Sequence, residues 1–182
     1  MFKPKAKVSR RGLLQFGGAL ALTLTPLARA EAAKLFEREI SFHNLHTGEN
    51  LTRTYWAAGA YVPEALEEID TILRDWRTGD VHPMEPGLLD FLYDLRIAMS
   101  SDKPFNVISG YRTPKTNAKL ASASSGVAKK SLHMRGMAID VALPGRDLAD
   151  LRQTAIGLQR GGVGFYPKSG FIHVDIGRVR NW

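Results

Sequence analysis

The most constraining feature of this sequence is the stretch of residues 131–140 (SLHMRGMAID), which places an imidazole and a carboxylate seven residues apart. On a continuous strand His133 and Asp140 would lie about 23 Å apart, and on a helix about 10.5 Å apart along the axis. Neither spacing lets both side chains bind one metal ion. The chain must therefore reverse between them, and Gly136 is where a reversal costs least. We predict a hairpin that carries His133 on one arm and Asp140 on the other.

A third metal ligand is available close to the end of the sequence. A metal bound by nitrogen and carboxylate oxygen usually takes three protein ligands and keeps one position open for water. In residues 170–175 (GFIHVD), alternation places His173 and Asp175 on the same face of a short strand. The sequence therefore predicts a zinc site formed by His133, Asp140 and His173.

The residue inventory leaves few other ways to build such a site. The chain has no cysteine, so a metal must be held by His, Asp or Glu, and no disulfide contributes to the fold. Only five histidines are present. We interpret His43 and His46 as part of a polar strand face and its turn, and His82 as a solvated residue of a proline-rich connector.

Three blocks follow one another in the C-terminal half: residues 109–114 (SGYRTP), residues 131–140, and the segment around His173. Together they resemble the zinc D-Ala-D-Ala metallopeptidase family, which shares the hedgehog/DD-peptidase fold. Within that family, residues 161–167 (GGVGFYP) and the closing residues 173–175 (HVD) most resemble the murein endopeptidase K branch of bacterial cell-wall enzymes. The resemblance covers roughly residues 104–182.

The resemblance also implies roles for residues around the metal. The planar guanidinium of Arg112 matches a carboxylate, and in the resembled family the arginine of this block serves the substrate, whereas Ser131 stands where a family serine contacts the substrate. A surface ion pair is the alternative role for Arg112, and turn capping for Ser131. Several family members place an acid three residues before the third ligand, where this chain has Gly170. Asp175 is our candidate general base, with orientation of a ligand histidine as its alternative role.

Two functions follow from these residues and the resemblance. The first is a zinc-dependent peptidase that hydrolyses peptidoglycan stem peptides or cross-links, as an endopeptidase or a carboxypeptidase. The alternative is a non-catalytic, zinc-stabilised cell-wall binding module, as hedgehog-type relatives allow. A nearby acid and Arg112 favour the enzyme, and the expected cofactor is Zn²⁺.

Residues 1–30 are typical of an export signal. They contain six basic residues and no acidic one, and five of the basic residues precede an apolar run from Leu13 to Leu27 that is short for a membrane span. Residues 28–30 (ARA) form a small-x-small cleavage site, and residues 9–14 (SRRGLL) resemble the twin-arginine motif. We expect cleavage after Ala30, a periplasmic location and no stable membrane insertion afterwards, with an ordinary secretory signal as the alternative.

The formal net charge of +7 does not predict a nucleic-acid partner. Six of the 25 basic residues lie in residues 1–30, which leaves 19 basic against 18 acidic residues in the rest of the chain. A basic binding surface is therefore not indicated. We expect a monomer whose partners are peptidoglycan peptides.

Residues 31–182 have the length of one domain. We predict an α+β fold in which a small antiparallel sheet carries helices on one side. Hydrophobic periodicity and turn residues predict a hairpin over residues 37–56 and helices over about 63–76, 87–100, 113–120 and 145–161. Strands are expected at 105–109, 163–166 and 171–176.

Overall fold

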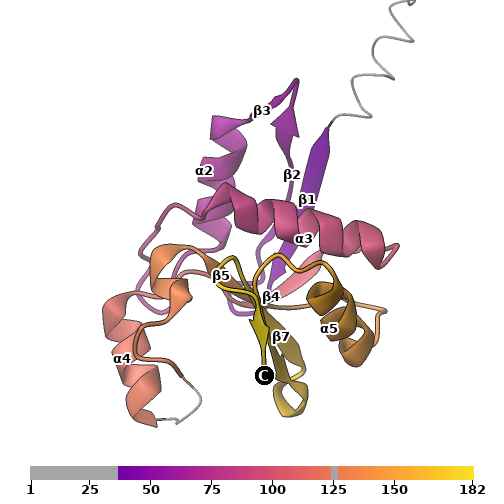
Figure 1. Cartoon of the computed structure of the whole chain (residues 1–182). Coiled ribbons are helices and arrows are strands. Elements are labelled where there is room, and N and C mark those ends of the chain that lie inside the picture. The colour runs from indigo at the N-terminus through magenta and orange to yellow at the C-terminus, as the bar shows by residue number, and fades with distance from the viewer. Residues whose placement is uncertain (1–36, 124–126) are drawn as a thin grey trace, which may run out of the picture.

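The computed structural model of this chain describes residues 37–123 and 127–182 (Figure 1). The predicted export signal of residues 1–30, with its twin-arginine motif and cleavage site, lies outside the described residues.

A mixed sheet of eight strands runs through the described part of the chain, in the order β3-β2-β1-β4-β5-β7-β6-β8 (Figure 1). The strands are β1 (Arg38–Asn44), β2 (Asn50–Ala57), β3 (Ala60–Tyr61), β4 (Phe105–Ser109), β5 (Ala138–Ala142), β6 (Gly162–Tyr166), β7 (Phe171–Asp175) and β8 (Arg180–Asn181). The predicted α+β class is confirmed. The sheet is larger than the small antiparallel one that we predicted, and two of its pairs, β1 with β4 and β6 with β8, are parallel.

Four α-helices and two short 3-10 helices connect these strands within the described residues. They are α2 (Pro63–Ile72), α3 (Pro86–Ala98), α4 (Pro114–Ala123), η1 (Leu132–Arg135), α5 (Leu148–Gly157) and η2 (Pro167–Ser169). Proline stands at the first turn of α2 and of α3, where its missing N–H would have no helical partner. The helix α2 ends four residues before Trp76, which we had placed in the helix. Trp76 lies instead in a turn, in which the backbone N–H groups of Thr78 and Gly79 donate to the carbonyl oxygen of Asp75.

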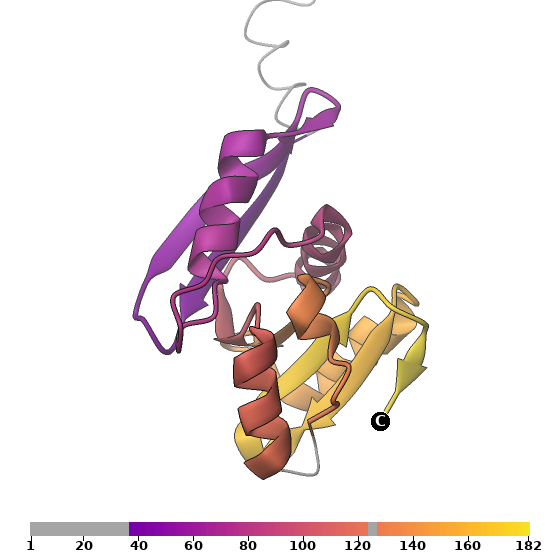
Figure 2. The ribbon, with the colours of Figure 1, turned by 90° about the vertical axis from the view of Figure 1, so that its left-hand side faces the viewer.

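The hydrophobic core lies between one face of the sheet and the helices α2, α3 and α5. Alternation along β5 sends Ile139 and Val141 into this core, and along β7 it sends Ile172 and Val174 there. The helix α4 contributes no side chain to the core cluster. Figure 2 shows α4 and η1 on one side of strands β5 to β7 and α5 on the other, so helices cover both sides of this part of the sheet. Because these four aliphatic side chains of β5 and β7 point into the core, the opposite face of these two strands carries their polar side chains.

Candidate metal centre

The predicted reversal between His133 and Asp140 is present, and Gly136 makes it possible. Gly136 has a φ of +66°, and a Cβ atom at this position would lie 2.2 Å from the carbonyl oxygen of Pro83. Backbone conformation and close packing therefore both require glycine here. His133 lies on η1 and not on a strand arm, because Ser131 starts a 3-10 turn by accepting a hydrogen bond from the backbone N–H of His133 at 3.3 Å.

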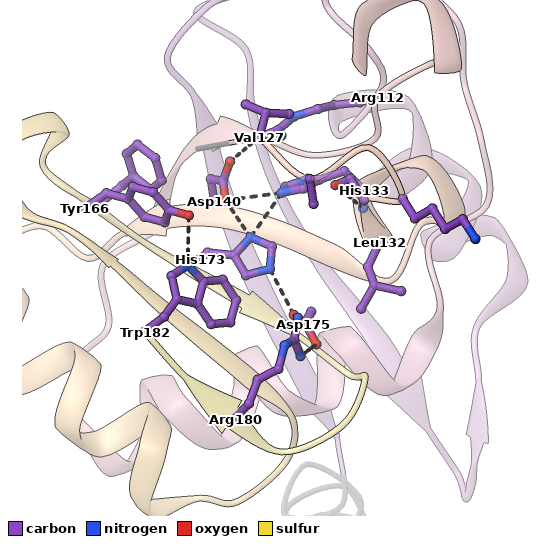
Figure 3. Close-up of a pocket in the computed structure, with 14 residues that line it drawn as sticks. Arg112, Val127, Leu132, His133, Asp140, Tyr166, His173, Asp175, Arg180 and Trp182 are labelled. Carbon is purple, nitrogen blue, oxygen red and sulfur yellow. Dashed lines mark hydrogen bonds and ion pairs between the residues drawn. The ribbon is translucent and has the colours of Figure 1, made fainter. Parts of the chain in front are cut away.

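The register of the sheet brings the other two predicted ligands together. Asp140 of β5 lies opposite His173 of β7 in an antiparallel pair. Both side chains point to the face away from the hydrophobic core, where η1 delivers His133 (Figure 3). His173 Nδ1 lies 2.9 Å from Asp140 Oδ1, and His133 Nε2 lies 3.2 Å from each of these two atoms. Exposure of the three residues is 1%, 4% and 9% for His133, Asp140 and His173.

The outer nitrogen of each histidine faces a hydrogen-bond acceptor. His133 Nδ1 lies 2.7 Å from the carbonyl oxygen of Gly110, and His173 Nε2 lies 3.0 Å from Asp175 Oδ2. Each outer nitrogen therefore carries a proton in the neutral ring, and each inner nitrogen presents a lone pair. Two lone pairs and the Asp140 carboxylate oxygen then converge without a proton between them.

This donor set fits a zinc ion. Ligand atoms in a tetrahedral zinc site with bonds of about 2.0–2.1 Å are about 3.3 Å apart. The three inner atoms of His133, Asp140 and His173 are separated by 2.9–3.2 Å, close to that spacing. A cation between these atoms would also offset the repulsion among the converging lone pairs. The three residues that we predicted as ligands are therefore together and could hold a metal.

Burial and neighbouring charges set the protonation of the three ligands. Burial raises the pKa of Asp140, but the larger combined effect of His133, His173 and Arg112 lowers it below its usual value, so that this carboxyl is ionised. Burial lowers the pKa of His133 and outweighs the opposite effect of Asp140. Burial also lowers the pKa of His173, but hydrogen bonds to Asp140 and Asp175 raise it above its usual value. A cation bound between these atoms would favour the neutral form of both histidines.

Arg112, our candidate for holding the substrate, borders the cavity and also contacts a predicted ligand. Its Nη2 forms an ion pair with Asp140 Oδ2, and its Nε donates a hydrogen bond to Ser109 Oγ at 2.7 Å. Within residues 37–123 and 127–182, Nη1 makes no hydrogen bond. Arg112 thus orients the Asp140 carboxylate, and the N–H groups of Nη1 stay available for another partner.

Asp175 lies beneath His173 and is fully buried. Its Oδ2 accepts hydrogen bonds from His173 Nε2 at 3.0 Å and from Arg180 Nη2 at 2.7 Å. Its Oδ1 accepts three more, from Arg180 Nη1 at 3.0 Å and from the backbone N–H groups of Gly162 and Gly177. Burial raises the pKa of Asp175, but hydrogen bonds from His173 and Arg180 have the larger effect and hold it below its usual value. Both oxygens of this carboxylate are thus occupied by the protein.

The three inner atoms open onto a cavity of about 330 Å³. Leu132, the first residue of η1, and Ser131, the residue before it, line this cavity. Three aromatic side chains form another part of its wall: Tyr166, Phe171 and Trp182. Three basic side chains also line it: Arg112, Lys130 and Arg180 (Figure 3). A peptide therefore has room to approach the converging ligands from one side.

Comparison with known proteins identifies the family. The family described as "Peptidoglycan L,D-endopeptidase MepK" matches residues 31–182. A protein of Escherichia coli (strain K12) with the same name is 39% identical over 180 residues, which are 98% of this chain and 99% of the relative. The "Probable peptidoglycan L,D-endopeptidase MepK" of Haemophilus influenzae is 39% identical over 179 residues, 96% of this chain and 95% of the relative.

The chain belongs to the MepK family. The predicted resemblance to the murein endopeptidase K branch is thereby confirmed, and the match extends beyond the roughly 80 C-terminal residues that carried the sequence motifs.

The remaining histidines of this MepK-family chain lie elsewhere. His43 pairs with Asn50 on the outer hairpin, His46 stacks on Trp76 with ring centroids 4.1 Å apart, and His82 bonds the neighbouring carbonyl of Pro83. None of them belongs to the group of possible metal ligands found in the described part of the chain. This agrees with our interpretation of all three.

Arg180 and Trp182 are among the residues that border the cavity and that sequence reasoning missed. They come from β8 and the residue that follows it. A two-residue strand has no periodicity that could reveal it. The available signal was the glycine-rich run of residues 161–164, since glycine within a strand often marks the close approach of another chain segment.

Proposed function

We propose that this chain is a zinc-dependent peptidase that cleaves peptidoglycan peptides as an L,D-endopeptidase. The observation that carries the proposal is the convergence of two histidine lone pairs and one carboxylate oxygen at the floor of a peptide-sized cavity. The names of the MepK relatives supply the substrate and the type of bond. Cleavage between an L and a D centre in stem peptides or cross-links is the activity that these facts support best.

A zinc ion in this site would supply a Lewis acid that polarises a peptide carbonyl and acidifies water at the open position. The chain's own residues prepare the site for it. Arg112 holds Asp140 in its ionised form, and the carbonyl of Gly110 fixes the ring of His133. The low exposure of all three ligands excludes bulk water from their outer sides.

We propose that Asp175 orients His173 and does not act as the general base that we had predicted. A base for water must reach the cavity and have a pKa near the working pH. Asp175 borders the cavity, but it has no solvent-exposed surface, its pKa is lowered, and five hydrogen bonds occupy its two oxygens. Its contact with His173 Nε2 instead holds the ring so that Nδ1 points to the metal position.

Arg112 and Ser131 remain our candidates for binding the substrate. Arg112 would do so through Nη1, since Nε and Nη2 each already contact a protein group, Ser109 and Asp140. Ser131 lines the cavity and uses a lone pair of its oxygen as a cap for η1. Its hydroxyl proton can therefore still be donated to a peptide carbonyl.

We also propose that residues 1–30 direct export by the twin-arginine route and are removed after Ala30. The relatives' substrate, peptidoglycan, lies outside the cytoplasm, which supports a periplasmic location. Across residues 37–123 and 127–182, every helix is too short or too polar to cross a bilayer. Replacing Arg10 and Arg11 together by lysine should leave the full-length precursor in the cytoplasm, as detected by mass spectrometry of cell fractions.

Digestion of purified cross-linked muropeptides tests the proposed activity. The zinc-loaded chain should convert them to shorter products whose masses identify the cleaved bond. The His133→Ala chain and the chelated wild-type chain should leave them intact. His43→Ala, which changes a half-buried histidine outside the site, should retain activity. An unchanged muropeptide profile from a chain that contains zinc would instead support the non-catalytic binding module.

A further inference from the structure

Asp75 is a buried carboxylate outside the metal centre, and the proposed mechanism does not use it. It is 1% exposed, and within residues 37–123 and 127–182 it forms no ion pair. Its Oδ2 accepts hydrogen bonds from the backbone N–H and the hydroxyl of Thr113, both at 2.9 Å, and its Oδ1 accepts one from the N–H of Arg77 at 3.1 Å. Burial raises the pKa of Asp75, but the hydrogen bonds that it accepts have the larger effect and lower it. A buried charge is costly, so its partners indicate which part of the molecule it serves.

The backbone of Asp75 is itself fixed by a turn. Its N–H donates to the carbonyl oxygen of Asp80 at 3.0 Å, and its carbonyl oxygen accepts hydrogen bonds from the N–H groups of Thr78 and Gly79 at 3.1 and 2.7 Å. The turn follows directly on α2, which is anchored in the hydrophobic core. The carboxylate of Asp75 is therefore a rigid attachment point that is joined to the core.

The loop of residues 110–113 (GYRT) packs against the chain just after α2. Gly110 lies so close to Leu73 that a Cβ atom on this glycine would be 2.3 Å from the carbonyl oxygen of Leu73. The N–H of Tyr111 donates to the same oxygen at 2.8 Å. The loop is therefore attached at its start to Leu73 and at its end to Asp75.

The other side of this loop carries two groups that orient the predicted ligands. The carbonyl oxygen of Gly110 faces His133 Nδ1 at 2.7 Å, and the guanidinium of Arg112 pairs with Asp140. The backbone N–H of Arg112 also donates to the carbonyl oxygen of His133 at 3.2 Å. A displacement of the loop would therefore move the partners of two ligands at once.

We infer that Asp75 is a positioning residue for the metal centre, which acts through Thr113 and the loop of residues 110–113. This inference rests on the proposed zinc-dependent function and adds to it a residue from outside the cavity. Both oxygens of Asp75 accept hydrogen bonds, so an amide in either orientation would turn its NH₂ group toward a donor. Asp75→Asn therefore loosens the loop while the size of the side chain is kept.

Zinc affinity, measured by competition with a chromophoric chelator, tests the inference. Asp75→Asn should bind zinc about tenfold more weakly, the lower end of the loss that follows changes around metal ligands. Thr113→Val, which replaces the hydroxyl by a methyl group, should change the affinity in the same direction, whereas Thr113→Ser should bind zinc like the wild type. Asp75→Asn and Thr113→Val combined should lose less than the product of the two single losses, because both remove the same hydrogen bond.

The matched control is Asp90→Asn. Asp90 also accepts hydrogen bonds on both carboxylate oxygens, from Arg38, Tyr55 and Tyr61. These partners lie on β1, β2 and β3 and not in the loop that Asp75 holds. Asp90→Asn should lower the free energy of unfolding and keep the wild-type zinc affinity. Equal zinc affinities of Asp75→Asn and Asp90→Asn would overturn the inference, because Asp75 would then serve stability alone.

Amide hydrogen exchange decides the inference without a metal. In metal-free Asp75→Asn the N–H of Arg112 should exchange about tenfold faster than the loss of global stability accounts for, because the loop opens locally. In Asp90→Asn its exchange should change only as far as global stability does. Unchanged protection of Arg112 in Asp75→Asn would refute the inference. A wild-type chain that leaves cross-linked muropeptides intact would refute the proposed activity, and the exchange result would still decide the role of Asp75.

Discussion

The two faces of strands β5 and β7 are both buried, yet they serve different purposes. On the core face, four aliphatic side chains are at most 1% exposed: Ile139, Val141, Ile172 and Val174. On the opposite face, Asp140, His173 and Asp175 are at most 9% exposed. The side chains on the core face need only fill the space available to them, whereas each charged group on the opposite face makes ion pairs with other side chains. Burial alone therefore does not distinguish a core residue from a functional one.

The contrast has an energetic reason. Apolar burial stabilises a fold by about 25 cal/mol per Å², whereas buried charges lose hydration that even good partners only offset. The polar face is therefore expected to contribute little to stability and to be retained for metal binding. Substitutions on the two faces should separate activity from stability.

The largest effect is expected on the polar face. His173→Ala removes a predicted ligand and should lower peptidase activity by a factor on the order of 10³ or more, because metal polarisation is worth several kcal/mol. Circular dichroism should show the fold retained, and metal analysis should show zinc lost. If His173→Ala keeps near-wild-type activity with a full zinc complement, the two faces do not differ as described.

The next largest effect lies on the core face of the same strand as Asp140. Ile139→Ala should lower the free energy of unfolding by about 3 kcal/mol, the usual cost of a cavity in place of a buried aliphatic side chain. Its kcat and zinc content should equal those of the wild type under conditions where it is folded. Urea denaturation and steady-state kinetics check this. Loss of kcat without loss of stability would contradict the proposed division.

Asp175→Asn sharpens the comparison, since the substitution keeps the shape of the side chain and removes its charge. If Asp175 orients His173, zinc affinity should fall by about 10- to 100-fold, and kcat should recover when zinc is saturating. The measurement is activity as a function of free zinc concentration. A kcat that stays low at saturating zinc would instead restore the role of general base.

Ser131→Ala is expected to have the smallest effect. Loss of the η1 cap should lower the free energy of unfolding by about 1 kcal/mol. If Ser131 also binds substrate, KM should rise as well, whereas capping alone would leave KM unchanged in the folded protein. Thermal unfolding and KM measurements on the same preparation distinguish these two roles.

Local patterns in the sequence predicted the residues that converge, because spacing and alternation are local properties. The seven-residue spacing of His133 and Asp140 required a reversal, and alternation placed His173 and Asp175 on one face of a strand. The sheet register then pairs that strand with β5, where Asp140 lies opposite His173. The α+β class followed from the same kind of pattern.

What the sequence did not predict depends on contacts between distant segments. The parallel pairing of β1 with β4 and the placement of β8 beside β6 involve residues that are not neighbours in sequence. The ion pairs of Arg112 with Asp140 and of Arg180 with Asp175 depend on that packing. Motif reasoning could therefore find the acid beside His173, but it could not show that Asp175 is enclosed.

X-ray absorption at the zinc edge tests the central claim most directly, because it measures which atoms surround the metal in the zinc-loaded chain. The account predicts two imidazole nitrogens and a carboxylate oxygen at about 2.0–2.1 Å, with loss of the imidazole signal in His133→Ala. A zinc environment made of oxygen atoms alone in the wild-type chain would contradict it.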